Sequence, residues 1–394
     1  MIPVADSRRC AQKSMRVLFW SETFWPRVGG VENLAARLLP ALRNRGHEFI
    51  VVTWGTPDLP SEELYVDIPV HRFPFFPGIQ PGNINPLTEA AAKVRKLKQE
   101  FRPDLVHVNS YGGSVLFHLM TANAHPAPTL VTLHQALPNE PVGQETLLGK
   151  VLRSADWVTT CSKAVLEQTR ELLPEISSRT SVIYNALELP DASAVPLRFD
   201  APRLLCLGRL VQSKGFDLAL EAFAQVLNRF PQARLIVAGD GSERKTLERQ
   251  TDELGLAQSV EFLGSVSPEK VPHVIAEATL VLIPSRLEGF SLVALEAAWM
   301  GRPVVGAQIG GLPEVVAHGE PGLLTEVDDG AAFARAITTL LDQPEIARQM
   351  GWAARRRAQE LFSWDRYVDA YDEIYRKLNA GAREGASIHA QSTN

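Results

Sequence analysis

Short apolar segments alternate along the chain with segments whose apolar residues recur at helical spacing. Near the start, the apolar segments 15–20 and 48–54 flank residues 31–42, where apolar side chains recur every three or four positions. A strand, an amphipathic helix and a second strand in this order form a βαβ unit with parallel strands. The pattern therefore predicts an α/β protein built on parallel sheets.

The alternation continues through the rest of the first half. Further strands are predicted at 70–73, 105–108, 129–133, 157–160 and 181–184, and helices at 87–100 and from 113. This spacing predicts a parallel sheet with helices on both faces. Residues 189–202 contain three prolines and few periodic apolar positions, which is typical of an interdomain linker.

A second alternating set begins at residue 203. Its strands are predicted at 203–207, 234–238, 260–263 and 278–283, and one closing amphipathic helix at 362–378. The aromatic residues of that last helix are expected in the core rather than on a surface that stacks on bases. These are Trp364, Tyr367, Tyr371 and Tyr375.

At 394 residues the chain is long enough for two ordinary domains. The predicted order is a disordered tail (1–14), a first domain (15–190), a second domain (200–360), a final helix (361–380) and a Gly-, Ser- and Ala-rich disordered tail (381–394).

Composition narrows the functional classes. A hydrophobic content of 45% with 22% charged residues is typical of soluble globular proteins, and a net charge of -5 argues against a nucleic-acid partner. Cys10, Cys161 and Cys206 have no metal-type spacing, which indicates a reducing compartment. The chain lacks an apolar run of membrane-spanning length, and residues 1–14 lack the apolar core of a signal peptide, so a cytoplasmic protein is expected.

The candidate chemistry centres on residues 284–303. An apolar strand breaks at Pro284 and passes through Glu288, Gly289 and Ser291 into a helix. A helix that begins with a glycine and a capping serine leaves unpaired N–H groups at its positive end, which favours a phosphate. Because a carboxylate repels phosphate, Glu288 fits best as an acceptor for ligand hydroxyls. The stretch thus predicts a site for a phosphorylated sugar.

Glu288 and Glu296, in the segment 288–297, have a spacing that resembles the E-x7-E signature of retaining nucleotide-sugar glycosyltransferases of family GT4. Alone, Glu296 also fits a solvated helix face. The resemblance covers residues from about 15 to about 377 and implies the GT-B fold, in which two Rossmann-like domains face each other across a cleft and the final helix returns to the first domain.

The resemblance implies a hexosyltransferase that moves a sugar from a UDP-sugar, with UDP-glucose favoured, to a sugar, glycan or lipid-linked acceptor. Gly208-Arg209 and Lys214-Gly215 match a pair of family motifs that hold the donor diphosphate. Two cations in a loop after a strand suit two phosphates, although isolated loop cations are usually surface residues.

Other donor contacts are implied in the same way. Gly29 and Gly30 would face the diphosphate from the first domain, although the pair also fits an ordinary turn and is not a G-x-G-x-x-G motif. Val266 would lie at the nucleotide base, and Glu296 would hold the ribose. The remaining donor residues implied are Gly289, Phe290, Ser291 and Leu292.

On the first domain, His134 follows the strand 129–133 and so lies at the ligand edge of the sheet. The resemblance places such a histidine near the donor sugar, and we count it with Glu288, Arg209 and Lys214 as catalytic. Asn109 and Ser110 lie at the same edge and are expected on the acceptor side.

Asn185 is a third acceptor-side candidate. It stands where the family usually has Asn-Gly-Val-Asp, but this chain has Asn-Ala-Leu-Glu at 185–188, so only the asparagine carries over. The glycine pair Gly310-Gly311 is predicted to shape the second domain.

The sequence also indicates whether the reaction needs a metal ion or a cofactor. A DxD motif is missing beside the strand ends, and Asp328-Asp329 fits a helix cap, so we expect a metal-independent enzyme without a cofactor.

Three other functions share parts of the pattern: a nicotinamide enzyme, a GT-B-type UDP-sugar epimerase, and a catalytically silent nucleotide-sugar sensor. Release of UDP with and without an acceptor separates them from a transferase.

A cluster of basic residues accompanies the helix near 87–100. Most such clusters form solvated faces; the alternative is a peripheral contact with the cytosolic membrane leaflet near a lipid-linked acceptor. The cluster comprises Lys93, Arg95, Lys96, Lys98 and Arg102.

Overall fold

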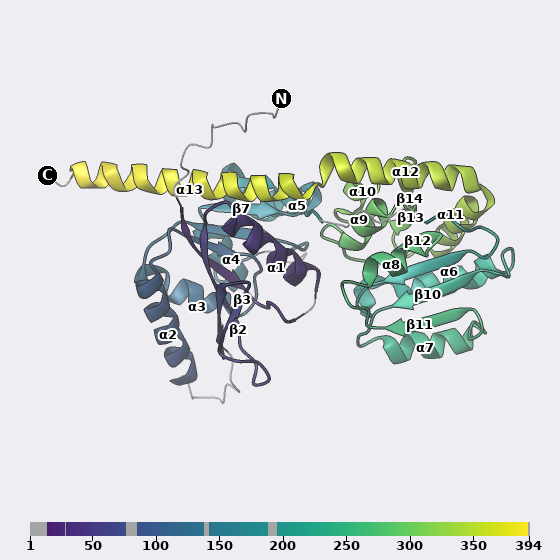
Figure 1. Cartoon of the computed structure of the whole chain (residues 1–394), viewed down its shortest axis with the longest axis horizontal. Helices are drawn as coiled ribbons and strands as arrows, with labels where there is room; N and C mark the ends of the chain where they lie inside the picture. The colour runs from purple at the N-terminus through teal and green to yellow at the C-terminus, as the bar shows by residue number, and fades with distance from the viewer. Residues whose placement is uncertain (1–13, 28, 76–84, 138–141, 188–194, 393–394) are drawn as a thin grey trace, which may run out of the picture.

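The computed structural model describes residues 14–27, 29–75, 85–137, 142–187 and 195–392. The chain forms two units, each built around one sheet, which lie side by side in Figure 1. The predicted α/β class and the two Rossmann-like domains are confirmed. Residues 1–13 of the predicted first tail and residues 189–194 of the predicted linker lie outside the described residues.

The first sheet has eight strands in the order β3-β4-β2-β1-β5-β6-β7-β8, and all neighbouring pairs are parallel except β3 and β4. The polar, exposed edge strand β3 was not predicted, because its sequence lacks an apolar alternation. The strands are β1 (Arg16–Ser21), β2 (Glu48–Trp54), β3 (Glu62–Tyr65), β4 (Ile68–Phe73), β5 (Leu105–Val108), β6 (Thr129–Leu133), β7 (Trp157–Thr160) and β8 (Thr180–Val182).

Helices connect the strands of the first sheet, as parallel pairing requires. On α1, the residues Leu34, Leu38 and Leu42 recur at helical spacing and are fully or almost fully buried. The helices are α1 (Gly30–Arg43), α2 (Asn85–Phe101), α3 (Val115–Met120), α4 (Leu147–Ser154) and α5 (Lys163–Leu172).

The second sheet has six parallel strands in the order β11-β10-β9-β12-β13-β14. This is the 3-2-1-4-5-6 order of a Rossmann sheet, in which the strand order reverses between the first and fourth strands. The strands are β9 (Arg203–Leu207), β10 (Arg234–Ala238), β11 (Val260–Gly264), β12 (Leu280–Ile283), β13 (Val304–Ala307) and β14 (Gly322–Thr325).

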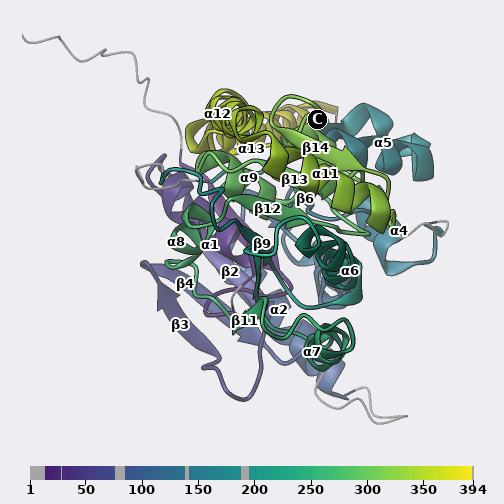
Figure 2. The same cartoon turned by 90° about the vertical axis from the view of Figure 1, so that its right-hand side faces the viewer.

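Both faces of the second sheet are covered. Leu280 and Leu282 of β12 pack in one apolar cluster, whereas Val281 and Ile283 pack in another, as expected for side chains that alternate across a strand. Figure 2 shows α6 and α11 together on one side of β9 and β12. The helices are α6 (Phe216–Leu227), α7 (Arg244–Glu253), α8 (Val271–Ala276), α9 (Leu292–Trp299), α10 (Leu312–Val315), α11 (Gly330–Asp342) and α12 (Pro344–Leu361).

The last helix, α13 (Trp364–Ser392), returns from the second unit and lies across the first. Tyr367, Tyr371 and Tyr375 are buried, which confirms that these aromatic residues belong to the core. The Tyr375 hydroxyl lies 2.6 Å from Nδ1 of His107, and Asp372 pairs with Nε2 of His47 at 2.7 Å. The helix continues beyond residue 380, where the sequence predicted an end.

The basic cluster on α2 differs from its prediction in one position. Lys98 is buried, and its Nζ donates hydrogen bonds to the carbonyl oxygens of His118 at 3.2 Å and Thr121 at 3.3 Å. Burial lowers the pKa of Lys98 to about 7. Lys98 therefore lies in the interior and is not part of a charged surface. None of the described helices is both long and apolar enough to cross a bilayer.

Candidate functional site

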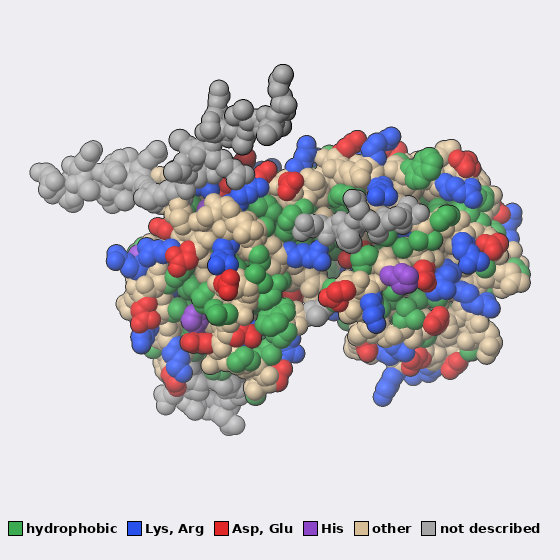
Figure 3. All heavy atoms as spheres, in the orientation of Figure 1, with side chains coloured by type: hydrophobic (Ala, Val, Ile, Leu, Met, Phe, Trp, Pro, Cys, Tyr) green, Lys and Arg blue, Asp and Glu red, His purple; other side chains and the backbone are tan. Residues whose placement is uncertain are grey.

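The site forms where the carboxyl ends of the strands of the two sheets approach each other. In the second sheet the segments after β9 and β12 lie at the reversal of strand order, where open α/β sheets bind ligands. Figure 3 shows the two units as lobes that part below α12 and α13. The predicted residues after β9 and β12 are thus placed at one edge of the second unit.

Gly215 brings the segment after β9 against the segment after β12. Its φ of +67° lies in the left-handed region, and a Cβ at this position would collide with the carbonyl oxygen of Pro284. Only glycine combines this conformation with so close an approach. The contact sets Lys214, the residue before it, next to Glu288.

Lys214, in the segment after β9, forms an ion pair with Glu288, in the turn between β12 and α9. Nζ of Lys214 lies 2.6 Å from Oε1 of Glu288, and the hydroxyl of Ser285 donates to the same oxygen at 2.9 Å. Glu288 is only 7% exposed. Because both bonds go to Oε1, the other carboxylate oxygen is left as an acceptor for a ligand hydroxyl, as far as the described residues show.

Arg286 holds this turn in place, and sequence reasoning missed it. Its guanidinium donates two hydrogen bonds to the Asp217 carboxylate, at 2.9 and 2.7 Å, and a third to Asp328 at 2.7 Å. The bonds to Asp217, together with the pairing to Asp328, raise the pKa of Arg286. The partners lie 69 and 42 residues away in the sequence, so no local pattern could reveal them.

The start of α9 has the geometry of an N-terminal cap. Ser291 adopts a φ of +74°, uncommon for a residue with a side chain, and its hydroxyl accepts from the N–H of Ala294 at 3.4 Å. Phe290, by contrast, is buried between the rings of Tyr184 and Phe362, with centroids 6.0 and 5.3 Å away. Its side chain therefore packs in the core, and only its backbone is placed to meet a ligand.

Two glycines mark where the units touch. A Cβ on Gly30, the first residue of α1, would lie 2.8 Å from Cδ1 of Leu292 on α9. A Cβ on Gly289 would lie 2.5 Å from the carbonyl oxygen of His134, which follows β6. Of the predicted donor glycines of the first unit, Gly30 therefore meets the start of α9, as does the predicted histidine, whereas a Cβ on Gly29 would meet the Glu32 side chain.

His134, Asn109 and Asn185 form a polar group on the first unit. Nε2 of His134 lies 3.1 Å from Oδ1 of Asn109. Three buried atoms of the group form no well-aligned hydrogen bond among the described residues: Nδ1 of His134, Nδ2 of Asn109 and Oδ1 of Asn185. The Asn185 side chain nevertheless lies within reach of His134 and acts to raise the pKa of its ring. Buried polar atoms are rarely left unpaired, so the group is suited to receive ligand hydroxyls.

The protonation of His134 follows from its surroundings. Burial lowers its pKa to about 4, which keeps the ring neutral near pH 7. If Nε2 donates to Asn109, then Nδ1 carries a lone pair and accepts a hydrogen bond. His134 can therefore orient a hydroxyl, but it is a poor acid at neutral pH.

Ser110 ties two strand ends of the first sheet together. Its hydroxyl accepts from the N–H of Glu22 at 3.0 Å and lies 3.4 Å from the hydroxyl of Ser21. Glu22, which sequence reasoning missed, accepts from both the N–H and the hydroxyl of Ser114. These bonds fix the loops after β1 and β5 on the expected acceptor side.

Glu296 lies half-buried on α9. Burial raises its pKa to about 7, and the nearby positive charge of Arg37 on α1 partly offsets this effect. The carboxylate therefore lies within the electrostatic influence of a cation of the other unit. An ionised Glu296 would be a strong acceptor for paired hydroxyls.

The remaining predicted donor residues lie in the segments after β9 and β11. Gly208 and Arg209 follow β9 in the same loop as Lys214, and the Arg209 side chain is exposed. Val266 is half-buried after β11, which is two positions away from β9 in the sheet.

The predicted helix cap is observed at the start of α11. The Asp329 carboxylate accepts from the N–H of Ala332 at 2.8 Å, which confirms the cap. Among the residues that the structure describes, no group of three or more His, Cys, Asp or Glu side chains is arranged to hold a metal ion.

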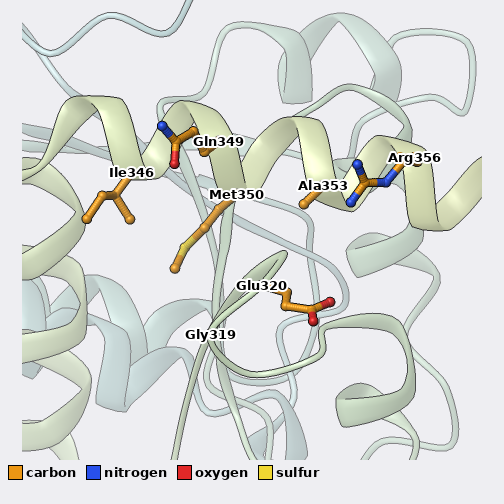
Figure 4. Close-up of a pocket in the computed structure, with 7 residues that line it drawn as sticks. All are labelled: Gly319, Glu320, Ile346, Gln349, Met350, Ala353 and Arg356. Atoms are coloured by element: carbon orange, nitrogen blue, oxygen red, sulfur yellow. The ribbon is translucent and has the colours of Figure 1, made fainter.

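A small cavity of about 250 Å³ lies elsewhere, between α12 and the turn before β14 (Figure 4). Met350 and Ile346 supply apolar walls, and Glu320 and Arg356 supply opposite charges. None of its lining residues is one of the candidate site residues.

Comparison with known proteins covers both units. Residues 28–189 match the profile of the family described as Glycosyltransferase Family 4, and residues 193–357 match that described as Glycosyl transferases group 1. The glycogen synthase of Mycobacterium tuberculosis is 28% identical over 408 residues, which covers 94% of this chain and 96% of that protein. The N-acetyl-alpha-D-glucosaminyl L-malate synthase of Bacillus anthracis is 27% identical over 372 residues, covering 90% and 95% respectively.

Solved structures show the same architecture. Sucrose-phosphate synthase from Thermosynechococcus elongatus gives a TM-score of 0.80 at 25% identity, covering 93% of this chain and 100% of that one. HepE of Anabaena, solved with UDP and glucose, gives 0.76 at 24% identity, covering 92% and 100%. The chain therefore belongs to the GT4 family of glycosyltransferases and has the GT-B fold.

Proposed function

We propose that this glycosyltransferase moves a hexose from a UDP-sugar, with UDP-glucose as the first candidate, to a hydroxyl of a glycan, polysaccharide or glycolipid. The observation that carries the proposal is the ion pair of Lys214 and Glu288, 2.6 Å apart at the start of α9. It sets a cation for phosphate beside an acceptor for sugar hydroxyls. The UDP and glucose bound to HepE support the choice of donor.

The diphosphate would be held from the second unit. Lys214 would offer a point charge and Arg209 a planar fork, and the first turn of α9 would add backbone N–H groups at the positive end of its helix dipole. Gly30 contacts Leu292 on α9, so the start of α1 would cover the phosphates from the first unit.

The hexose would lie between the two units. Oε2 of Glu288 is the acceptor on one side, and the unpaired atoms of His134, Asn109 and Asn185 are the partners on the other. Gly289 contacts the backbone of His134, so the two sets are close neighbours. The ribose would bind Glu296, where vicinal hydroxyls suit a carboxylate.

For the chemical step we propose the route that membership of this family suggests. The oxygen of the acceptor hydroxyl attacks C1 of the hexose from the face of the leaving group, and the bond from C1 to the phosphate oxygen breaks with its electron pair on UDP. The proton of the acceptor passes to a phosphate oxygen of the departing UDP. Because the acceptor enters on the face from which UDP leaves, the anomeric configuration is retained. Arg209 and Lys214 stabilise the charge that grows on the phosphate.

Because these cations already meet the phosphate charge, we propose that the enzyme needs neither a divalent metal nor a cofactor. Turnover should then be unchanged by EDTA and by added magnesium. A requirement for either would contradict this part of the proposal.

Release of UDP from a panel of nucleotide sugars, with and without acceptors, tests the function. The proposal predicts release that depends on the acceptor and a product whose proton NMR coupling shows the donor's anomeric configuration. Conversion of the donor without an acceptor would instead indicate an epimerase, and binding without release would indicate a sensor. Turnover of NADH would indicate a nicotinamide enzyme.

A further inference from the structure

Glu314 of α10 caps a helix of the other unit. Its Oε2 accepts from the N–H of Lys163 and its Oε1 from the N–H of Ala164, both at 2.9 Å. These are the first two residues of α5, and the hydroxyl of Ser162 takes the N–H of Val165 at 3.2 Å. The first three N–H groups of α5 are therefore satisfied, two of them from across the interface.

The segment before Glu314 lies on the sugar-binding turn. A Cβ on Gly310 would collide with the carbonyl oxygen of Glu288, and one on Gly311 with that of Gly289. The N–H of Gly311 donates to the carbonyl oxygen of Glu288 at 3.3 Å. This glycine pair, expected only to shape the second domain, thus rests directly on the backbone of the candidate site.

The same glycine also reaches the first unit. A Cβ on Gly311 would lie 2.7 Å from Cβ of Ser162, the cap residue of α5. The guanidinium of Arg357 on α12 donates to the carbonyl oxygen of Glu314 at 2.8 Å, which holds the end of α10 in place. A continuous set of contacts therefore runs from α5 through Glu314 and Gly311 to Glu288.

We propose that Glu314 is a positioning residue that docks α5 onto the second unit and thereby sets the Glu288-Gly289 turn against His134. The inference rests on the proposed function for the role of Glu288, and it adds the device that aligns the two halves of the site. A carboxylate suits this place because it accepts from two N–H groups at the positive end of a helix dipole.

A docking contact of this kind would also be reversible. When the units separate, the carboxylate and the N–H groups of Lys163 and Ala164 can all return to water, so opening leaves no charge buried. Hydrogen bonds of this kind would stabilise the closed form but still let the units open, which is needed for the donor to enter and UDP to leave.

The test removes the same contact from both sides. Glu314→Gln keeps the shape but gives up one of the two acceptors. Lys163→Pro deletes the N–H that Glu314 accepts; proline is well tolerated as the first residue of a helix, and Ser162 is already extended, with φ -154° and ψ 162°. Lys163→Ala is the matched control, because it removes the side chain and keeps the N–H.

Three measurements are made on each full-length variant: the distance between fluorophores on the two units with saturating UDP, the affinity for UDP, and kcat with donor and acceptor. We expect Glu314→Gln and Lys163→Pro to lengthen the distance and lower kcat by about tenfold or more, with UDP affinity within about twofold. Lys163→Ala should match the natural protein, and the double variant should be less impaired than the product of the single effects.

The inference fails if Lys163→Pro behaves like Lys163→Ala, or if either damaging variant loses kcat without a change in distance. Thermal melts identify a variant that simply unfolds, and the other variant of the pair then decides. If the natural protein releases no UDP from any sugar nucleotide, the proposed function fails, whereas the distance measurement still decides whether Glu314 docks the units.

Discussion

At the scale of single residues, the proposed site contains an ion pair, Lys214 with Glu288, that exists before any donor binds. Lys214 is neutralised by Glu288, and Glu288 has little exposure of its own. Binding of a diphosphate would therefore redistribute an existing pair rather than attract a free cation. Substitutions can therefore separate the contribution of Lys214 to stability from its contribution to the reaction.

Replacing Lys214 with Met should lower both stability and activity. It leaves the Glu288 carboxylate buried without its cation, which should cost about 1 to 2 kcal/mol of unfolding free energy, given the partial exposure of Lys214. The double variant Lys214→Met with Glu288→Gln should recover most of that stability in urea titrations. It should not recover kcat; if it did, neither side chain would be needed for the reaction.

Glu296 predicts a dependence on pH. Its pKa in the folded protein is about 7, above the ordinary value near 4.5, so its contribution to stability is present at acid pH and is lost as pH rises through 7. Glu296→Gln does not ionise, so its melting temperature relative to the natural protein should rise between pH 5 and pH 8.

Glu296→Gln should also weaken donor binding. An ionised carboxylate binds the ribose hydroxyls best, so Glu296→Gln should raise the donor KM by about tenfold at pH 8 and less at pH 5. Equal donor KM values for the two proteins at pH 8 would exclude a role for Glu296 in donor binding.

Residue-level prediction succeeded where the chemistry is local. Asp329 caps α11, and the tyrosines of α13 pack in the core, as their sequence context indicates. Arg286, Glu22 and Glu314 were missed because their partners lie far away in the sequence. Their roles depend on which segments the fold brings together.

At the scale of elements, buried strands were the easiest to predict. β2 and β6 have the predicted bounds, since an apolar run enclosed by polar turns leaves little choice. The edge strand β3 has a mostly polar sequence, and α13 continues past a glycine at 381, so neither followed from periodicity.

The basic face of α2 is weaker than its sequence indicates. Lys98 is buried, Lys93 pairs with Glu89 at 2.8 Å, and Lys96 lies 3.6 Å from Glu100. We therefore expect little preference for anionic lipid over neutral lipid when the protein is sedimented with vesicles at physiological salt. Strong sedimentation with anionic vesicles alone, abolished by Lys93→Glu and Lys96→Glu, would establish a membrane contact through α2.

At the scale of the whole molecule, the pattern of strands and helices predicted two parallel sheets but not how they meet. The contacts of Gly289 with His134 and of Gly30 with Leu292 join segments whose sequences carry no signal for each other. The two facing halves were expected only through resemblance to a known family. The structure adds the contacts that hold them, including α13 across the first unit and Glu314 at the start of α5.

The most direct test of the central claim is steady-state release of UDP from UDP-glucose and related donors, measured with and without acceptor for the natural protein, Arg209→Met and Lys214→Met. The account predicts release that depends on the acceptor, and a loss of kcat in both variants, because the charge they meet is greatest in the transition state. Release without any acceptor, or variants that change only KM, would contradict it.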